Sequence, residues 1–151
     1  MLTLTSELRC LLLVEGERAR TAADARSASI SRWERESGLL RTLVNVGDLH
    51  GSPYERFPHD EVYPLDAFPA VDALLRRGEA YLNPDDVSSE SLAVYSRHGF
   101  HAGVPIRVDG EIWGELWVAR SIGAGRFTPH DVAQVERVSE RLGDGLARHV
   151  G

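Results

Sequence analysis

Residues 101–120 have the sequence HAGVPIRVDGEIWGELWVAR, and this stretch decides the fold. Two runs rich in apolar and β-branched residues flank Asp109-Gly110, a pair typical of a two-residue turn between antiparallel strands. Such a turn also predicts which residues pair across the strands, and it places Val104 opposite Glu115. We therefore expect a β-hairpin in which the two runs are hydrogen-bonded to each other.

Side chains alternate along a strand, so this register divides the hairpin into two faces. The first face is expected to hold Ala102, Val104, Ile106, Trp113, Glu115 and Trp117. The second face is expected to hold His101, Gly103, Pro105, Arg107, Ile112, Gly114, Leu116 and Val118. The two glycines of the second face suit the close approach of a helix.

The rest of the chain shows helical patterns at both ends and strand patterns between them. Apolar residues recur near a 3.6-residue period in Leu4–Ala25 and in Thr128–Arg148, and Thr128 is the expected N-cap of the second helix. Strands are predicted at 28–34, 39–46, 80–82, 101–108 and 111–120, short helices at 67–77 and 88–98, and a long loop at 49–65. This order of elements indicates an α+β fold with an antiparallel sheet.

Composition limits the classes of partner and location. The chain has 151 residues, 42% of them hydrophobic, which fits one domain over residues 1–151. It has 23 acidic and 17 basic residues and a net charge of −6, which argues against nucleic acid or an anionic membrane as a partner. No apolar run approaches the length of about 20 residues that spans a bilayer, so we expect a cytoplasmic protein.

Catalytic chemistry has little support in the sequence. All the basic residues are Arg, which excludes Schiff-base lysines and a phosphate-loop lysine. The single cysteine, Cys10, excludes an intramolecular disulfide and a cysteine-rich zinc site, and we expect it to be a small buried residue. Ser27, Ser29 and Ser31 alternate along one strand and indicate a polar strand face. No nucleophile with an adjacent base is visible, so we do not expect an enzyme.

Several motifs resemble the GAF domain, a sensory fold related to the PAS domain. Val104-Pro105-Ile106 before Asp109-Gly110 resembles the family's "V-P-L…x-D-G" strand and turn, and Ile112-Trp113-Gly114-Glu115-Leu116 resembles its "x-x-G-x-L" strand. Phe127-Thr128-Pro129-His130-Asp131 resembles the "F-T-x-x-D" start of its last helix. The Arg-rich, Lys-free composition resembles GAF modules of actinobacterial signalling proteins.

This resemblance implies a fold and a kind of site. Terminal helices would cover one sheet face and pair between two subunits, while short helices and loops would cover a ligand pocket on the other face. Because Lys is absent and Cys10 lies on the first helix, the family's cyclic-nucleotide and covalent bilin sites are not expected, and one thiol does not support its methionine sulfoxide reductases. A haem would need an axial histidine, for which His98 and His101 are the candidates.

The candidate ligand wall is formed by Trp113, Glu115 and Trp117, two aromatic rings beside a carboxylate, which suits a flat or cationic ligand. Aromatic residues of the segments that would roof the cavity extend the site: Tyr63, Phe68, Tyr81 and Tyr95. The alternative is that both tryptophans are core residues and that Glu115 pairs with Arg41 or Arg32.

Two functions therefore stand at the level of sequence. The first is a sensory module that binds an unidentified small molecule and signals through a helical homodimer to an output domain. Such a module could be a piece of a longer chain or a stand-alone regulator. The second is a dimerisation or protein-interaction module without a small-molecule ligand.

Overall fold

The computed structural model describes residues 2–49, 55–82 and 99–150. Its regular elements are α1 (Ser6–Ala22), β1 (Ser27–Glu34), β2 (Leu39–Gly47), β3 (Val62–Pro64), η1 (Leu65–Ala67), α2 (Pro69–Arg77), β4 (Tyr81–Leu82), β5 (Gly99–Val108), β6 (Glu111–Ser121), η2 (Ile122–Ala124) and α4 (Pro129–Val150). The fold is α+β, as the sequence predicts. The helix expected at 88–98 lies outside the described residues.

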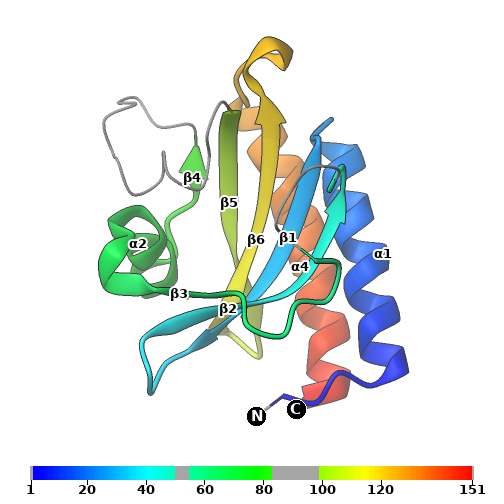
Figure 1. The fold of residues 1–151 in the computed structure, drawn as a ribbon, viewed down its shortest axis with the longest axis vertical. Coiled ribbons are helices and arrows are strands. Elements are labelled where there is room, and N and C mark those ends of the chain that lie inside the picture. Colours follow the sequence, from blue (N-terminus) through cyan, green and yellow to red (C-terminus); the bar gives the residue numbers. More distant parts are fainter. Residues whose placement is uncertain (1, 50–54, 83–98, 151) are drawn as a thin grey trace.

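The strands form one six-stranded antiparallel sheet in the order β3-β2-β1-β6-β5-β4. Figure 1 shows α1 and α4 side by side on one face of this sheet and α2 near its other side. The two terminal helices therefore share a face, while α2 and η1 belong to the opposite face.

The hairpin of β5 and β6 forms around Asp109-Gly110, but its register differs from the predicted one. Near the turn Val108 pairs with Glu111, as expected, and then the pairing shifts between Ile106 and Arg107. Beyond this bulge Ile106 lies opposite Gly114, not opposite Trp113. A bulge inserts one extra residue into one strand, so every later side chain of β6 changes its partner.

The faces of the hairpin must be reassigned accordingly. The face toward α1 and α4 holds Ala102, Val104, Ile106, Gly114, Leu116 and Val118, and the α2 face holds Gly103, Pro105, Glu115 and Trp117. The expectation that Trp113, Glu115 and Trp117 share one face is therefore wrong. Trp113 packs against the core on the α1 and α4 side, whereas Trp117 packs on the α2 side.

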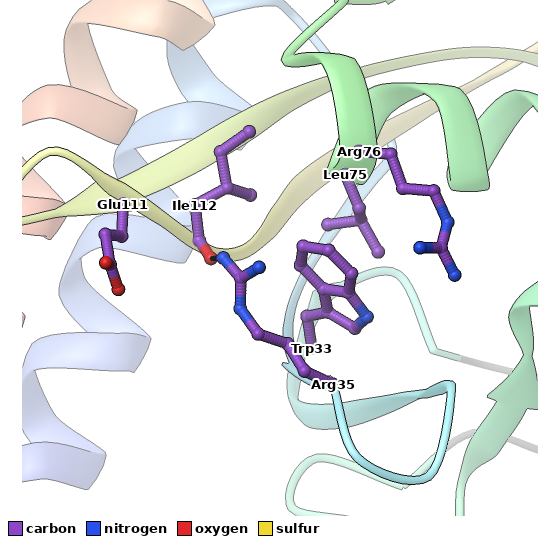
Figure 2. A pocket seen from close by; sticks show the side chains of 6 residues that line it. All are labelled: Trp33, Arg35, Leu75, Arg76, Glu111 and Ile112. Carbon is purple, nitrogen blue, oxygen red and sulfur yellow. Dashed lines mark hydrogen bonds between the residues drawn. The ribbon is translucent and has the colours of Figure 1, made fainter.

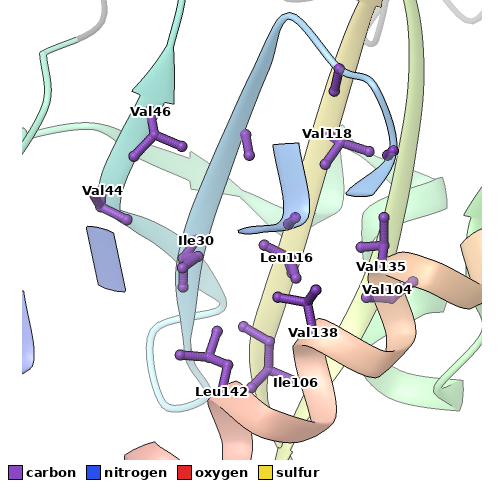
Figure 3. Close-up of a cluster of buried hydrophobic side chains, with 14 of the residues drawn as sticks. Ile30, Val44, Val46, Val104, Ile106, Leu116, Val118, Val135, Val138 and Leu142 are labelled. Atoms are coloured by element: carbon purple, nitrogen blue, oxygen red, sulfur yellow. The ribbon is translucent and has the colours of Figure 1, made fainter. Parts of the chain in front are cut away.

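The main core lies between the sheet and the terminal helices. Figure 3 shows strand side chains facing those of α4, among them Ile30, Val44, Val46, Val104, Ile106, Leu116 and Val118 from the sheet and Val135, Val138 and Leu142 from the helix. From α1, Leu8 and Leu12 complete this cluster and are at most 2% exposed. Burial of each such side chain contributes about 1.5–3 kcal/mol to folding.

A second, smaller apolar cluster lies beneath α2. Leu74 and Leu75 of this helix pack with Leu40 of β2 and with the aromatic residues of the α2 face. The helix begins with Pro69 at its first turn and ends at Gly78, whose φ of 68° is the left-handed conformation that favours glycine.

The terminal helices begin with side-chain caps. The Thr128 hydroxyl accepts a hydrogen bond from the Asp131 backbone N–H at 3.2 Å, and the Asp131 carboxylate accepts one from the Thr128 N–H at 2.8 Å. This reciprocal pair confirms Thr128 as N-cap. At the start of α1 the Thr5 hydroxyl accepts a single hydrogen bond from the Leu8 N–H at 3.2 Å.

Two further expectations about local structure are wrong. Cys10 is exposed on α1, because it lies on the side of the helix away from the sheet. The long loop at 49–65 contains a short strand, β3, whose Tyr63 pairs with Leu40 at the edge of the sheet. None of the helices over the described ranges is long and apolar enough to span a bilayer.

Candidate functional site

Buried polar side chains lie on the α2 face of the sheet. Ser31, Thr42 and Glu115 are each at most 5% exposed, and Ser31 is paired with both Thr42 and Glu115 in the sheet. The Ser31 hydroxyl donates a hydrogen bond to the Thr42 hydroxyl oxygen at 3.2 Å. The alternating serines therefore do indicate a polar strand face, but one that is covered at its centre.

Glu115 is the exceptional member of this group. Its carboxyl is 5% exposed, and one of its oxygens, Oε2, is fully buried and accepts no hydrogen bond from any residue that the structure describes. Because burial disfavours the charged form, the pKa of Glu115 rises to about 8. The carboxyl is therefore mainly protonated at pH 7, and it can then donate one hydrogen bond as well as accept others.

Neither of the two arginines proposed as the counter-charge, Arg41 or Arg32, pairs with Glu115 among the described residues. The Arg41 guanidinium binds the Glu34 carboxylate through two nitrogens at 3.0 and 3.1 Å. This pairing lowers the pKa of Glu34. Within the described ranges Arg32 forms no ion pair with Glu115 either. A buried acid without a counter-charge is costly for folding, which is the usual mark of a group kept for a purpose.

Trp117 lies two residues from Glu115 on the same strand and the same face. Its indole N–H donates a hydrogen bond to His101 Nδ1 at 3.0 Å, and its ring stacks on Tyr81 at a centroid distance of 5.1 Å. Gly103 makes room for this ring, since a Cβ there would lie 2.3 Å from it. The structure thus brings together Glu115, Trp117 and Tyr81.

His101 lies on the Trp117 side of the sheet, so its expected placement opposite the tryptophans is wrong. As the acceptor of the indole hydrogen bond, its Nδ1 carries no proton. Sequence reasoning missed this pairing because the bulge moved Trp117 from its expected partner, Ala102, to Gly103. His98 and Tyr95 lie outside the described residues.

The other predicted site residues are distributed differently. Tyr63 and Phe68 meet edge to face, with ring centroids 5.9 Å apart, and both belong to the apolar cluster under α2. The Tyr63 hydroxyl donates to Glu61 Oε2 at 2.9 Å. Trp113 lies on the opposite face of the sheet, where it packs against the main core, and it does not belong to the apolar cluster under α2.

Asn45, a polar residue at the far end of this face, was not predicted as a site residue. The Asn45 side-chain amide donates to the Glu55 carbonyl at 2.8 Å and to Glu61 Oε1 at 3.1 Å. An asparagine inside a β-branched run was the available signal, because strand interiors are depleted in this residue. Among the described residues no three His, Cys, Asp or Glu side chains gather as metal ligands.

Comparison with known families assigns this α+β fold to a class of protein. The family model for the GAF domain matches residues 8–146. The chain belongs to the GAF family. None of the curated proteins matches it.

Solved structures with the same fold come from several bacteria. The chain is similar to the GAF domain/HD domain protein from Geobacter sulfurreducens, with a TM-score of 0.77, 17% identity and coverage of 98% of this chain and 96% of that one. For the blue-light absorbing form of the PixJ GAF domain from Thermosynechococcus elongatus the TM-score is 0.71, with 13% identity and 95% and 89% coverage.

The GAF-B domain of DevS from Mycobacterium smegmatis is a further match, with a TM-score of 0.70, 15% identity and coverage of 93% and 94%. Identities this low concern the fold alone. Since Geobacter and Thermosynechococcus proteins match alongside a mycobacterial one, the particular resemblance to actinobacterial modules is not supported.

Proposed function

We propose that this chain is a non-catalytic sensory module that binds a small molecule on the α2 face of its sheet. The observation that carries the proposal is the buried Glu115 carboxyl, whose Oε2 has no hydrogen-bond partner among the described residues. Trp117 and Tyr81 supply a stacked aromatic surface beside it. A ligand that bonds to Glu115 would remove the cost of the unsatisfied polar group, which is about 1–3 kcal/mol.

The state of Glu115 indicates what ligand chemistry fits. A protonated carboxyl offers a donor and an acceptor side by side, which matches a flat ring with neighbouring N–H and C=O groups. A cationic ligand also fits, because it would stabilise the ionised carboxylate and displace the proton. Either ligand can stack on the aromatic rings.

The signal would leave through the terminal helices. We propose that α1 and α4 pair with those of a second copy, in the cytoplasm, and that an attached or partner output domain reads the change. Val14 on α1, 42% exposed, supports an apolar contact on this side of the molecule. A ligand that favours one arrangement of such a helical pair would shift its equilibrium.

A second candidate function is a dimerisation or interaction module whose site is filled by its own side chains. The Trp117 ring favours this candidate, because it occupies the space that a side chain at position 103 would take. The two functions differ in whether anything binds beside Glu115.

Native mass spectrometry of the purified chain tests the proposal. We expect a dimer that carries additional mass, and we expect Glu115→Met to lose that mass, because methionine keeps an unbranched side chain of similar length but removes the carboxyl oxygens. Glu111→Gln, an exposed change on the same strand, is the matched control and should retain it. A bare dimer would favour the interaction module. Additional mass that survives Glu115→Met would show that the ligand binds elsewhere.

A further inference from the structure

A groove that Glu115 does not line opens on the surface where three elements meet. It has a volume of about 460 Å³ and is lined by Trp33 and Arg35 from the β1 end, Leu75 and Arg76 from α2, and Glu111 and Ile112 from the start of β6. Figure 2 shows the Trp33 ring between the side chains of Arg35 and Arg76. The groove thus combines an aromatic ring, aliphatic walls and two guanidinium groups.

The charges on this groove are unequally neutralised. The Arg76 side chain binds Asp72 at 2.6 Å along α2. The Arg35 guanidinium lies 4.0 Å from the centroid of the Trp33 ring and donates to the Ile112 carbonyl at 2.7 Å, but it has no acidic partner in the part of the chain that the structure describes. Arg35 is therefore a cation fixed in place with its charge available, in a protein whose net charge is −6.

Trp33 adds a second unsatisfied group. Its indole N–H is buried and has no acceptor among residues 2–49, 55–82 and 99–150. A carboxylate in the groove can accept charge-assisted hydrogen bonds from the Arg35 guanidinium, which lies over the Trp33 ring. Trp and Arg at the centre of a partly apolar patch are the residue types that dominate protein–protein binding energy.

We propose that this groove docks an acidic peptide segment of a partner protein, with one carboxylate on Arg35 and a neighbouring apolar side chain against Leu75 and Ile112. Glu111 sets the direction of the segment, since a second carboxylate at that end of the groove would be repelled.

Labelled hexapeptides with one Asp next to Leu, Phe or Trp, each with a twin in which Asn replaces Asp, test this docking by fluorescence anisotropy. We expect at least one Asp peptide to bind below about 1 mM and its Asn twin to bind at least tenfold more weakly. Arg35→Gln should weaken binding at least tenfold, whereas Arg148→Gln, an exposed change near the end of α4, should leave it unchanged. Glu111→Gln should tighten binding about twofold, because it removes the repulsion.

Nitrogen-15 NMR spectra locate the bound peptide. The indole N–H signal of Trp33, assigned by its loss in Trp33→Phe, should shift on titration, while that of Trp117 should not. No binding by any of the three Asp peptides, equal binding by the Asn twins, or full binding by Arg35→Gln would overturn the proposal. A shift of the Trp117 signal in place of the Trp33 signal would overturn it as well. So would displacement of the peptide by an oligothymidylate that binds more tightly, because the arginines would then bind the phosphates of a nucleic acid.

Discussion

At the scale of one residue, two buried ionisable side chains, Glu115 and Arg120, give the clearest expected effects on stability. The sequence around Glu115 does not distinguish this residue, because a glutamate at an exposed strand position has no free-energy cost for folding. In the folded chain the same side chain is buried and retains its proton to about pH 8. The functional interest of the residue therefore comes from its surroundings and not from its identity.

The raised pKa of Glu115 predicts a pH-dependent stability. The unfolded chain releases this proton near the ordinary value of 4.5, whereas the folded chain retains it to about 8. Between these values the folded state binds more protons, so the free energy of unfolding falls as pH rises, and the loss is complete above pH 8. Glutamine does not titrate, so Glu115→Gln does not lose this stability as pH rises. Measured relative to the natural protein, the free energy of unfolding of the variant should therefore increase by on the order of 4 kcal/mol from pH 4.5 to pH 8.5.

Urea unfolding at a series of pH values measures this difference. Glu111→Gln changes an exposed acid on the same strand and should differ from the natural protein by a nearly constant amount at every pH. A Glu115→Gln curve parallel to that of the natural protein would mean that the carboxyl is ionised in the folded state.

Arg120 predicts a different effect, because its guanidinium is the centre of a structural joint. It donates to the carbonyls of Ala23 and Asp24 after α1 and to that of Arg126 before α4, and it lies 4.4 Å from the Phe127 ring centroid. Lys keeps the charge but lacks the planar set of donors. We expect Arg120→Lys to lower the free energy of unfolding by roughly 3 kcal/mol, since buried carbonyls lose their partners.

The measurement for Arg120 is equilibrium denaturation at pH 7. Arg137→Lys, at an exposed position on α4, is the control and should change the free energy by less than about 0.5 kcal/mol. An equally small effect at Arg120 would show that water replaces the three donors without loss.

At the scale of elements, the hairpin of β5 and β6 shows what a local pattern can and cannot predict. The Asp-Gly turn, the five predicted strands and the Thr128 cap are local features that form where the sequence indicates, whereas β3 was not predicted. The bulge before Arg107 is not signalled by a period-two pattern, yet it moves Trp113 to the other face and pairs Gly103 with Trp117. A one-residue difference in register was enough to divide the predicted ligand wall between two faces.

The packing of α4 gives a test at the same scale. Gly143 lies directly against β5, and a Cβ there would be 2.1 Å from the Arg107 carbonyl oxygen. Alanine has a higher helix propensity than glycine, by about 1 kcal/mol. The backbone of Arg107, however, cannot move aside as a flexible side chain would, so we expect the steric overlap to outweigh this gain. We expect Gly143→Ala to lower the free energy of unfolding by about 2 kcal/mol.

Thermal and urea unfolding of paired variants would separate the two effects. Gly145 contacts the flexible end of Leu11, so Gly145→Ala should cost less than Gly143→Ala. Gly123→Ala, with open space around it, should be nearly neutral. Stabilisation by Gly143→Ala would mean that α4 can move away from β5 at little cost.

At the scale of the whole molecule, both terminal helices lie on one face of the sheet and leave a side of α1 uncovered (Figure 1). Val14 and Cys10 are exposed one helical turn apart on this side. This arrangement is suited to contact with a second copy, and the proposed sensory function depends on it.

Light scattering after size exclusion tests the dimer directly. We expect a mass near twice 16.7 kDa for the natural chain, and a monomer for Val14→Arg, because a desolvated charge at the contact is costly while arginine still suits a helix. Ser37→Arg, in the turn between β1 and β2, should remain dimeric. A natural chain that is monomeric at all concentrations would remove the helical route for signalling.

The sequence by itself determined five of the strands, the Asp-Gly turn, the Thr128 cap and the two terminal helices, because these depend on neighbours within a few residues. It also limited the chemistry, since a chain without Lys and with one Cys lacks several kinds of site. Only the tertiary structure decided which residues share a face, that Arg41 pairs with Glu34 and not with Glu115, and that Trp33 and Arg35 line a groove. These outcomes depend on register, burial and contacts between residues far apart in the chain, which no local pattern encodes.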